Sequence, residues 1–90
     1  MIIDCHTHIF PEEVRKDREA FCKRDEAFSS IYKDPKSKMV GAEDLIASMD
    51  EFGIDQSVVC GFPWSQRDLC SLHNQYLMAS ASRYPNRLIV

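Results

Sequence analysis

Short apolar segments alternate along the chain with longer segments in which apolar residues recur at helical spacing. The short segments, which are typical of buried strands, are residues 1–5, 54–62 and 87–90. The longer segments predict helices over residues 12–28, 42–52 and 66–84. The expected order is β-α-α-β-α-β, which allows two helices between the first and second strands. This order favours an α/β fold with a parallel sheet and right-handed crossovers.

Local signals mark where the predicted helices begin and end. Pro11 and two glutamates open the first, because proline is tolerated in the first turn and acids favour the positive end of the helix dipole. Gly53 follows the second helix, as a left-handed cap would. Ser65 and Asp68 have the spacing of a capping box before the third. The apolar stripe of the second helix is expected to consist of Leu45, Met49 and Phe52.

Three parallel strands are too few for a closed (β/α)₈ barrel, which needs roughly 250 residues. Val90 falls inside the last apolar segment rather than after it. A parallel sheet of only three strands would also leave both of its edges exposed. We therefore expect residues 1–90 to form a single partial domain, the N-terminal part of a (β/α)₈ TIM barrel. The alternative is a compact small α/β domain that is complete in itself.

Composition narrows the classes of partner. The chain is 44% hydrophobic and 28% charged, as in ordinary globular proteins. Its net charge of −3 argues against nucleic-acid binding, which usually shows a basic patch. No apolar run approaches the roughly 20 residues of a membrane span, so no membrane partner is expected. Four cysteines, none in a CxxC pair, predict free thiols in a reducing cytoplasm.

Two histidines one residue apart carry the most specific chemistry. His6 and His8 follow the first apolar segment, and residues i and i+2 of a strand share a face. Both imidazoles should project together from the carboxyl end of the strand, where parallel-sheet proteins bind ligands. Such a pair suits a divalent metal, zinc above all. Asp4 is expected on the same face, to orient a histidine or satisfy main-chain groups, and Cys5 on the opposite face, packed against a helix.

The segment IIDCHTHIFP resembles the first strand of the amidohydrolase superfamily, which consists of metal-dependent (β/α)₈-barrel enzymes. The segments EDLIASMDEFGIDQSVVCGFPW and HNQYLMASASRYPNRLIV resemble the amidohydrolase-related branch, which includes hydrolases and non-oxidative decarboxylases of the aminocarboxymuconate-semialdehyde type. The resemblance implies that His6 and His8 share a metal with a later histidine and a late aspartate. It also implies that metal-activated water attacks a small-molecule substrate.

In that family the remaining ligands and the proton-shuttling aspartate would lie beyond Val90. No catalytic residue is therefore expected within these 90 residues, and the chain by itself should bind metal weakly and show no turnover. The expected activity of the whole protein is metal-dependent hydrolysis, with non-oxidative decarboxylation as the alternative. A metal-dependent nuclease barrel also carries an N-terminal HxH, but the acidic balance argues against it.

Other residues are weaker candidates. Trp64 and Phe10 are expected near the carboxyl ends of the strands, where they would either bind substrate or cover the top of the barrel. His73 is expected on a helix surface or in helix packing. Residues 29–40 read as a surface loop that is either a lid or a variable insertion.

Three further interpretations stay open. A non-enzymatic α/β module would bind a partner through the sheet edge or the Trp64 loop, and its histidines would be incidental. Exposed sheet edges also favour a homo-oligomer. A flavodoxin-like fold is the rival topology, but no glycine-rich phosphate loop follows the first strand.

Overall fold

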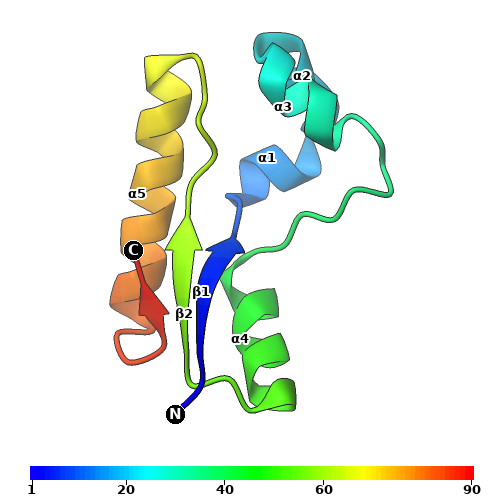
Figure 1. Ribbon diagram of the computed structural model, residues 1–90. Helices are drawn as coiled ribbons and strands as arrows, with labels where there is room; N and C mark the ends of the chain where they lie inside the picture. The colour runs from blue at the N-terminus through cyan, green and yellow to red at the C-terminus, as the bar shows by residue number, and fades with distance from the viewer.

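The computed structural model describes residues 1–90 as a three-stranded parallel sheet with helices between the strands (Figure 1). The strands are β1 (Ile3–His8), β2 (Gln56–Cys60) and β3 (Leu88–Ile89), and they lie in the order β1-β2-β3. The helices are α1 (Glu12–Lys16), α2 (Arg18–Arg24), α3 (Glu26–Tyr32), α4 (Ala42–Phe52) and α5 (Arg67–Arg83). The predicted α/β class and the parallel sheet are confirmed.

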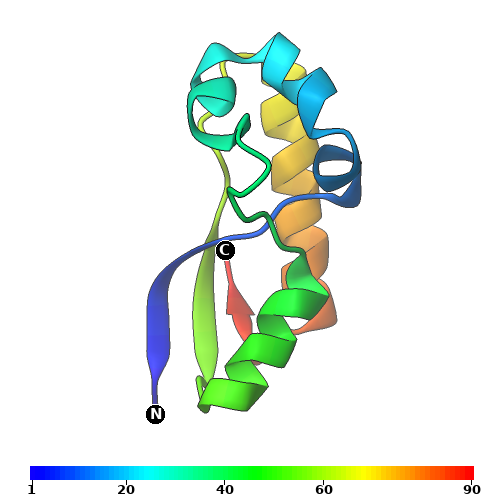
Figure 2. The ribbon, with the colours of Figure 1, turned by 90° about the vertical axis from the view of Figure 1, so that its right-hand side faces the viewer.

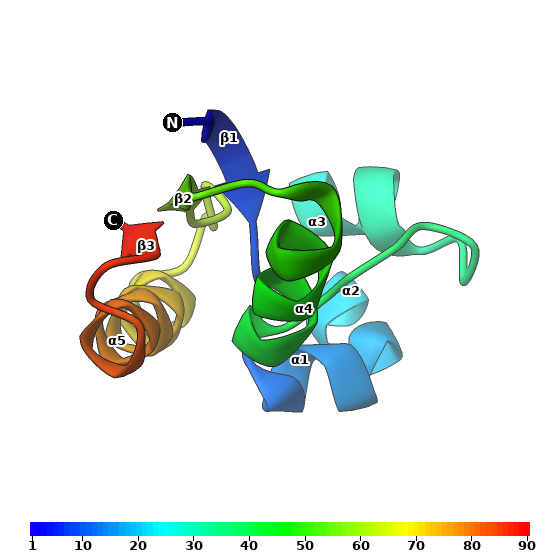
Figure 3. The ribbon, with the colours of Figure 1, turned by 90° about the horizontal axis from the view of Figure 1, so that it is seen from below.

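Helices α4 and α5 lie on the same face of the sheet and leave its other face uncovered (Figures 2 and 3). Burial along β2 follows this arrangement, because Ser57 and Val59 are buried and the residues between and beside them are only partly buried. The core between the helices and the sheet consists of Ile9, Ala42, Met49, Val59, Leu77 and Leu88. The covered face of the sheet therefore supplies one hydrophobic core.

The segment after β1 forms three short helices, so the prediction of one helix over residues 12–28 is wrong. The breaks fall at Asp17 and Asp25, which are the N-caps of α2 and α3. Asp17 accepts a hydrogen bond from the main-chain N–H of Ala20 at 3.3 Å, and Asp25 accepts one from that of Phe28 at 3.0 Å. Aspartate side chains compete with the helical hydrogen bonds of the main chain, so they favour caps over helix interiors.

Helices α1 to α3 lie beyond the carboxyl ends of β1 and β2 (Figure 1). There they form a second core with the loop after β2 and the start of α5. Its buried members are Phe10, Val14, Phe28, Trp64 and Leu69. The rings of Phe28 and Trp64 stack with centroids 4.7 Å apart. Aromatic packing thus covers the end of the sheet at which β1 and β2 finish.

Asp25 links this second core to the start of α5. Its Oδ2 accepts hydrogen bonds from the main-chain N–H and the hydroxyl of Ser65, at 2.8 and 2.9 Å. Burial opposes ionisation of this carboxyl, but its hydrogen bonds outweigh that effect and lower the pKa of Asp25. The capping box predicted for Ser65 and Asp68 is absent, because Ser65 bonds to Asp25 and Gln66 is the N-cap of α5.

Helix α4 has the predicted bounds, and Gly53 ends it in the left-handed conformation at φ 69°. Met49 is buried, as predicted. Phe52 is 69% exposed and belongs to neither core, so the predicted stripe is wrong at that position. None of the helices has the length and apolar character that crossing a bilayer requires.

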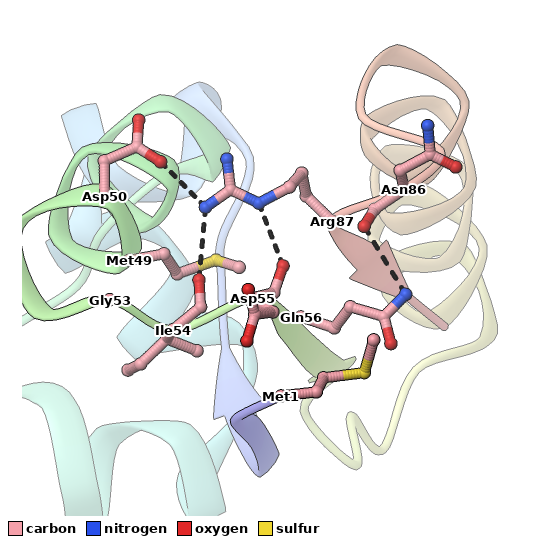
Figure 4. Close-up of a pocket in the computed structure, with 9 residues that line it drawn as sticks. All are labelled: Met1, Met49, Asp50, Gly53, Ile54, Asp55, Gln56, Asn86 and Arg87. Atoms are coloured by element: carbon pink, nitrogen blue, oxygen red, sulfur yellow. Dashed lines mark hydrogen bonds and ion pairs between the residues drawn. The ribbon is translucent and has the colours of Figure 1, made fainter.

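Arg87 makes contacts at the end of the sheet where the strands begin, opposite to the aromatic core (Figure 4). Its guanidinium lies 2.7 Å from the carboxylate of Asp50 and donates to the carbonyl oxygens of Ile54 and Asp55 at 3.2 and 2.9 Å. These residues line a pocket of about 400 Å³. The network joins the turn after α4 to the start of β3, which is a structural role at the end of the sheet remote from the histidines.

Candidate metal centre

Strand β1 contains an extra residue where the histidine pair begins. Pairing with β2 shifts between Asp4 and Thr7, where Cys5 and His6 stand opposite the single residue Val58. Such a β-bulge redirects side chains and is frequent next to active sites. Beyond it, Thr7 donates a hydrogen bond from Oγ1 to the carbonyl oxygen of Val58 at 2.8 Å, and this bond fastens β1 to β2 between the two histidines.

The two imidazoles lie side by side, as the strand alternation predicts. The Nε2 atoms of His6 and His8 are 3.0 Å apart, and the rings meet edge to face with centroids 4.8 Å apart. His8 pairs with Cys60, which follows the buried Val59 and so points away from the helices. The pair therefore occupies the uncovered face of the sheet, at the carboxyl end of β1.

This separation fits two ligands of one metal ion. Zinc–nitrogen bonds near 2.05 Å, with an angle between about 90° and about 110°, separate two ligand nitrogens by about 2.9–3.4 Å. The 3.0 Å between the Nε2 atoms of His6 and His8 falls within that range. No group of three or more histidine, cysteine, aspartate or glutamate side chains is placed to hold a metal. The described residues thus fit half of a four-ligand centre.

The two rings differ in their surroundings. His6 is exposed, whereas His8 is partly buried and its Nδ1 atom has no hydrogen-bond partner. Metal-binding histidines usually donate their other ring N–H to an acceptor, which fixes the direction of the ring. Without such an acceptor, the direction of the His8 ring depends on its contact with His6 and on the main chain that carries it.

Asp4 and Cys5 are not where the sequence alone predicts. Asp4 pairs with the buried Ser57, so it is not on the face of His8, and its Oδ1 accepts the main-chain N–H of His6 at 3.1 Å. It forms no hydrogen bond to either imidazole, so it serves the main-chain role that was expected as an alternative. Cys5 is exposed rather than packed beneath a helix. Both corrections follow from the bulge, which interrupts the regular alternation of the strand.

Trp64 and Phe10 are buried, with 6% and 1% exposure, among the aromatic side chains of the second core. Neither ring offers a face to a dissolved substrate. Of the two roles left open by the sequence, this position favours covering the end of the sheet. The indole of Trp64 is also engaged, since its N–H donates to Nδ1 of His73 at 3.0 Å.

His73 is a functional candidate whose contacts the sequence does not reveal. It is buried, at 1% exposure, which agrees with helix packing and excludes the helix surface. Burial, which is the largest effect, lowers the pKa of His73, and the nearby His8 lowers it further. The hydrogen bond to the main chain of Ile9 raises the pKa, but the net result is a decrease. One available signal was its position four residues from both Leu69 and Leu77, on the buried stripe of α5.

The predicted loop over residues 29–40 is in part helical, because α3 continues to Tyr32. The remainder is tied down at both ends. Arg18 donates to the carbonyl oxygens of Tyr32 and Asp34 at 3.1 and 2.6 Å, and Phe10 donates its main-chain N–H to the carbonyl oxygen of Val40 at 2.9 Å. The loop therefore returns directly beside the exit of β1.

Comparisons with protein-family models, with curated proteins and with solved structures give no match. The three pockets in the molecule are lined by neither His6 nor His8. What bears on function is therefore the local chemistry of the paired imidazoles and the topology that presents them.

Proposed function

We propose that His6 and His8 are this chain's ligands to a divalent metal, with zinc as the expected ion, in a metal-dependent hydrolase of the amidohydrolase type. The observation that carries the proposal is the 3.0 Å separation of the two Nε2 atoms. Their place at the carboxyl end of a parallel strand adds support, because ligands bind there in α/β proteins.

The topology supports a barrel as the parent fold. The strands follow one another in the order β1-β2-β3, and both crossover helices lie on one face (Figure 3). A doubly wound sheet carries helices on both faces and reverses its strand order at the ligand site. We therefore propose that the three strands are part of a (β/α)₈ barrel whose interior is the face that bears the histidines.

Within this centre each residue has a defined task. His6 and His8 bind the metal through Nε2, Thr7 fastens the strand between them, and Asp4 holds the main chain of the bulge. A bound divalent ion supplies Lewis acidity and lowers the pKa of a coordinated water towards ~7. No third ligating side chain joins the pair, so we propose that further ligands and a proton-transferring group are supplied by other residues. A small-molecule substrate is the expected partner.

A non-oxidative decarboxylase would use the same pair of ligands and is the alternative reaction. We also propose a cytoplasmic location, because free thiols, of which the chain has four, are typical of a reducing compartment.

A non-enzymatic interaction module is the second candidate, and the open sheet edges favour it. Ile2 and Ile3, beside the free edge of β1, are 58% and 44% exposed, and Ile89 and Val90, beside that of β3, are 41% and 62% exposed. Unpaired apolar edges invite strand pairing with a partner or a second copy. Light scattering over a concentration series tests this: the module interpretation requires stable self-association or partner binding without any dependence on metal.

Calorimetric titration of the purified chain with Zn²⁺ tests the metal proposal. We expect weak binding, because two protein ligands rarely hold zinc tightly, and we expect His6→Ala and His8→Ala each to abolish it. Cys5→Ser is the matched control, since Cys5 is exposed beside the pair and its thiol is the nearest competing zinc ligand in sequence. Nanomolar affinity that survives both histidine substitutions, or no binding by the unmodified chain, would overturn the proposal.

A further inference from the structure

His73 reaches from α5 to the strand that carries the histidine pair. Its Nε2 donates a hydrogen bond to the carbonyl oxygen of Ile9 at 2.6 Å. Ile9 is fully buried and directly follows His8 in the chain. The main chain that leaves the candidate metal centre is therefore held by a side chain from a helix 64 residues further along.

The other nitrogen of His73 binds the segment that follows β2. Its Nδ1 accepts the main-chain N–H of Phe62 at 3.2 Å and the indole N–H of Trp64 at 3.0 Å. All three bonds require the same neutral tautomer, with the proton on Nε2 and the lone pair on Nδ1. Burial lowers the pKa of His73, which favours this neutral form at pH 7. One ring thus ties together the chain exits of β1 and β2.

The ring of His8 needs such support from its main chain. Its Nδ1 has no partner, so the only hydrogen-bond contact of the imidazole is the one between its Nε2 and that of His6, and no group outside the pair sets the direction of the ring. The main chain is fixed on one side by the hydroxyl of Thr7, which bonds to β2, and on the other by the bond from His73 to Ile9. If the second bond is lost, the bond from Phe10 to Val40 still holds the chain one residue further on, but the carbonyl group of Ile9 is released, so that the main chain next to His8 can shift and the two Nε2 atoms lose their common target.

We propose that His73 is a positioning residue for the metal-binding pair, which acts by fixing the main chain after His8 so that the imidazoles of His6 and His8 converge. The inference rests on the proposed function of that pair and extends it to a residue outside the centre. It assigns to α5, which bears no metal ligand, a direct influence on the geometry of the site.

Three substitutions separate positioning from simple stability. His73→Phe keeps the volume of the ring and removes every hydrogen bond. His73→Gln retains an N–H that can reach the carbonyl oxygen of Ile9. Trp64→Phe is the matched control, because it removes one bond to Nδ1 and leaves the contact with Ile9 intact.

Two measurements are made on variants shown to be folded by circular dichroism. The first is Co²⁺ affinity with the visible spectrum of the bound ion, where we expect His73→Phe to weaken binding about 10- to 100-fold. We expect His73→Gln and Trp64→Phe to bind as the unmodified protein does. The second is the nuclear Overhauser effect between the rings of His6 and His8 without metal, which His73→Phe should abolish and the other two variants should keep.

The outcomes are distinguishable. If the unmodified protein binds no Co²⁺ but shows the ring contact, and His73→Phe loses that contact, the proposed function fails and the positioning role stands. If folded His73→Phe keeps the ring contact and wild-type affinity, or if Trp64→Phe loses as much as His73→Phe, the positioning role is overturned. His73→Asn, whose amide is too short to reach Ile9, replaces His73→Phe should the latter not fold.

Discussion

Asp25 accepts two hydrogen bonds from Ser65, 40 residues later in the chain, and this pair joins the helices after β1 to the start of α5. The same carboxylate caps α3 through the main-chain N–H of Phe28. One buried acidic side chain therefore fixes both the start of a short helix and its attachment to the rest of the molecule.

Replacing Asp25 should destabilise the protein more than an ordinary helix cap does. Asp25→Ala removes the cap and leaves the Ser65 N–H without its acceptor, so we expect the free energy of unfolding to fall by about 3 kcal/mol. Urea denaturation followed by circular dichroism measures it. Ser65→Ala is the control, since it removes only the hydroxyl bond and should cost about 1 kcal/mol. Equal losses in the two variants would contradict this account.

Stability should fall on mild acidification because of His73. Its pKa in the folded protein is lowered by burial and lies below the ordinary value of ~6.5. The unfolded chain therefore binds a proton more readily than the folded one, so the contribution is complete above about pH 6.5 and is lost as the pH falls below it. Urea midpoints between about pH 7.5 and about pH 5 measure the slope. In His73→Gln the slope should be shallower, and an unchanged slope would assign the effect to other groups.

Thr7 should couple the sheet to the metal centre. Thr7→Val preserves the shape of the side chain and removes the bond to the carbonyl oxygen of Val58, so we expect a loss of about 1 kcal/mol in stability and a severalfold weaker affinity for Zn²⁺. Thr7→Ser keeps the hydroxyl and should keep the affinity. Calorimetric titration compares the two, and a Thr7→Ser protein that binds as weakly as Thr7→Val would rule out the hydroxyl as the cause.

Gly53 should resist substitution for reasons of backbone conformation alone. Its φ of 69° is strained for residues with a side chain, yet a Cβ placed there meets no atom within 4 Å. Gly53→Ala should therefore lower the free energy of unfolding by about 1 kcal/mol. Gly61→Ala is the matched control, because its φ is unstrained and the nearest atom to a Cβ is 3.4 Å away. Thermal melts of the two variants compare them directly.

The predictable parts of the molecule are those determined by local chemistry. Gly53 ends α4 where a left-handed cap was expected, and the two-residue period of a strand places His6 beside His8. The breaks at Asp17 and Asp25 were also encoded locally, since aspartate is a strong N-cap, but the apolar spacing over residues 12–28 suggested a continuous helix.

The remaining errors concern contacts between distant segments. The bulge in β1 arises only from its pairing with β2, so the positions of Asp4 and Cys5 could not be predicted from the sequence of β1 alone. The partners of His73 lie between 9 and 64 residues away. Nothing in the helical spacing of α5 distinguishes a histidine that bonds to three such partners from one that packs without them.

The extra residue in β1 gives that strand two phases. Gln56 and Cys60 lie on the same side of β2. Ile3 pairs with Gln56 and His8 pairs with Cys60, so an odd-numbered and an even-numbered residue of β1 lie on that same side, before and after the bulge. Loss of Cys5 would remove the bulge and bring both stretches into a single phase, with His6 opposite Val58. The side of the sheet that Ile3 and Asp4 occupy thus depends on this single extra residue, and an insertion or deletion there would turn both side chains to the opposite side while Thr7 and His8 keep their pairing with β2.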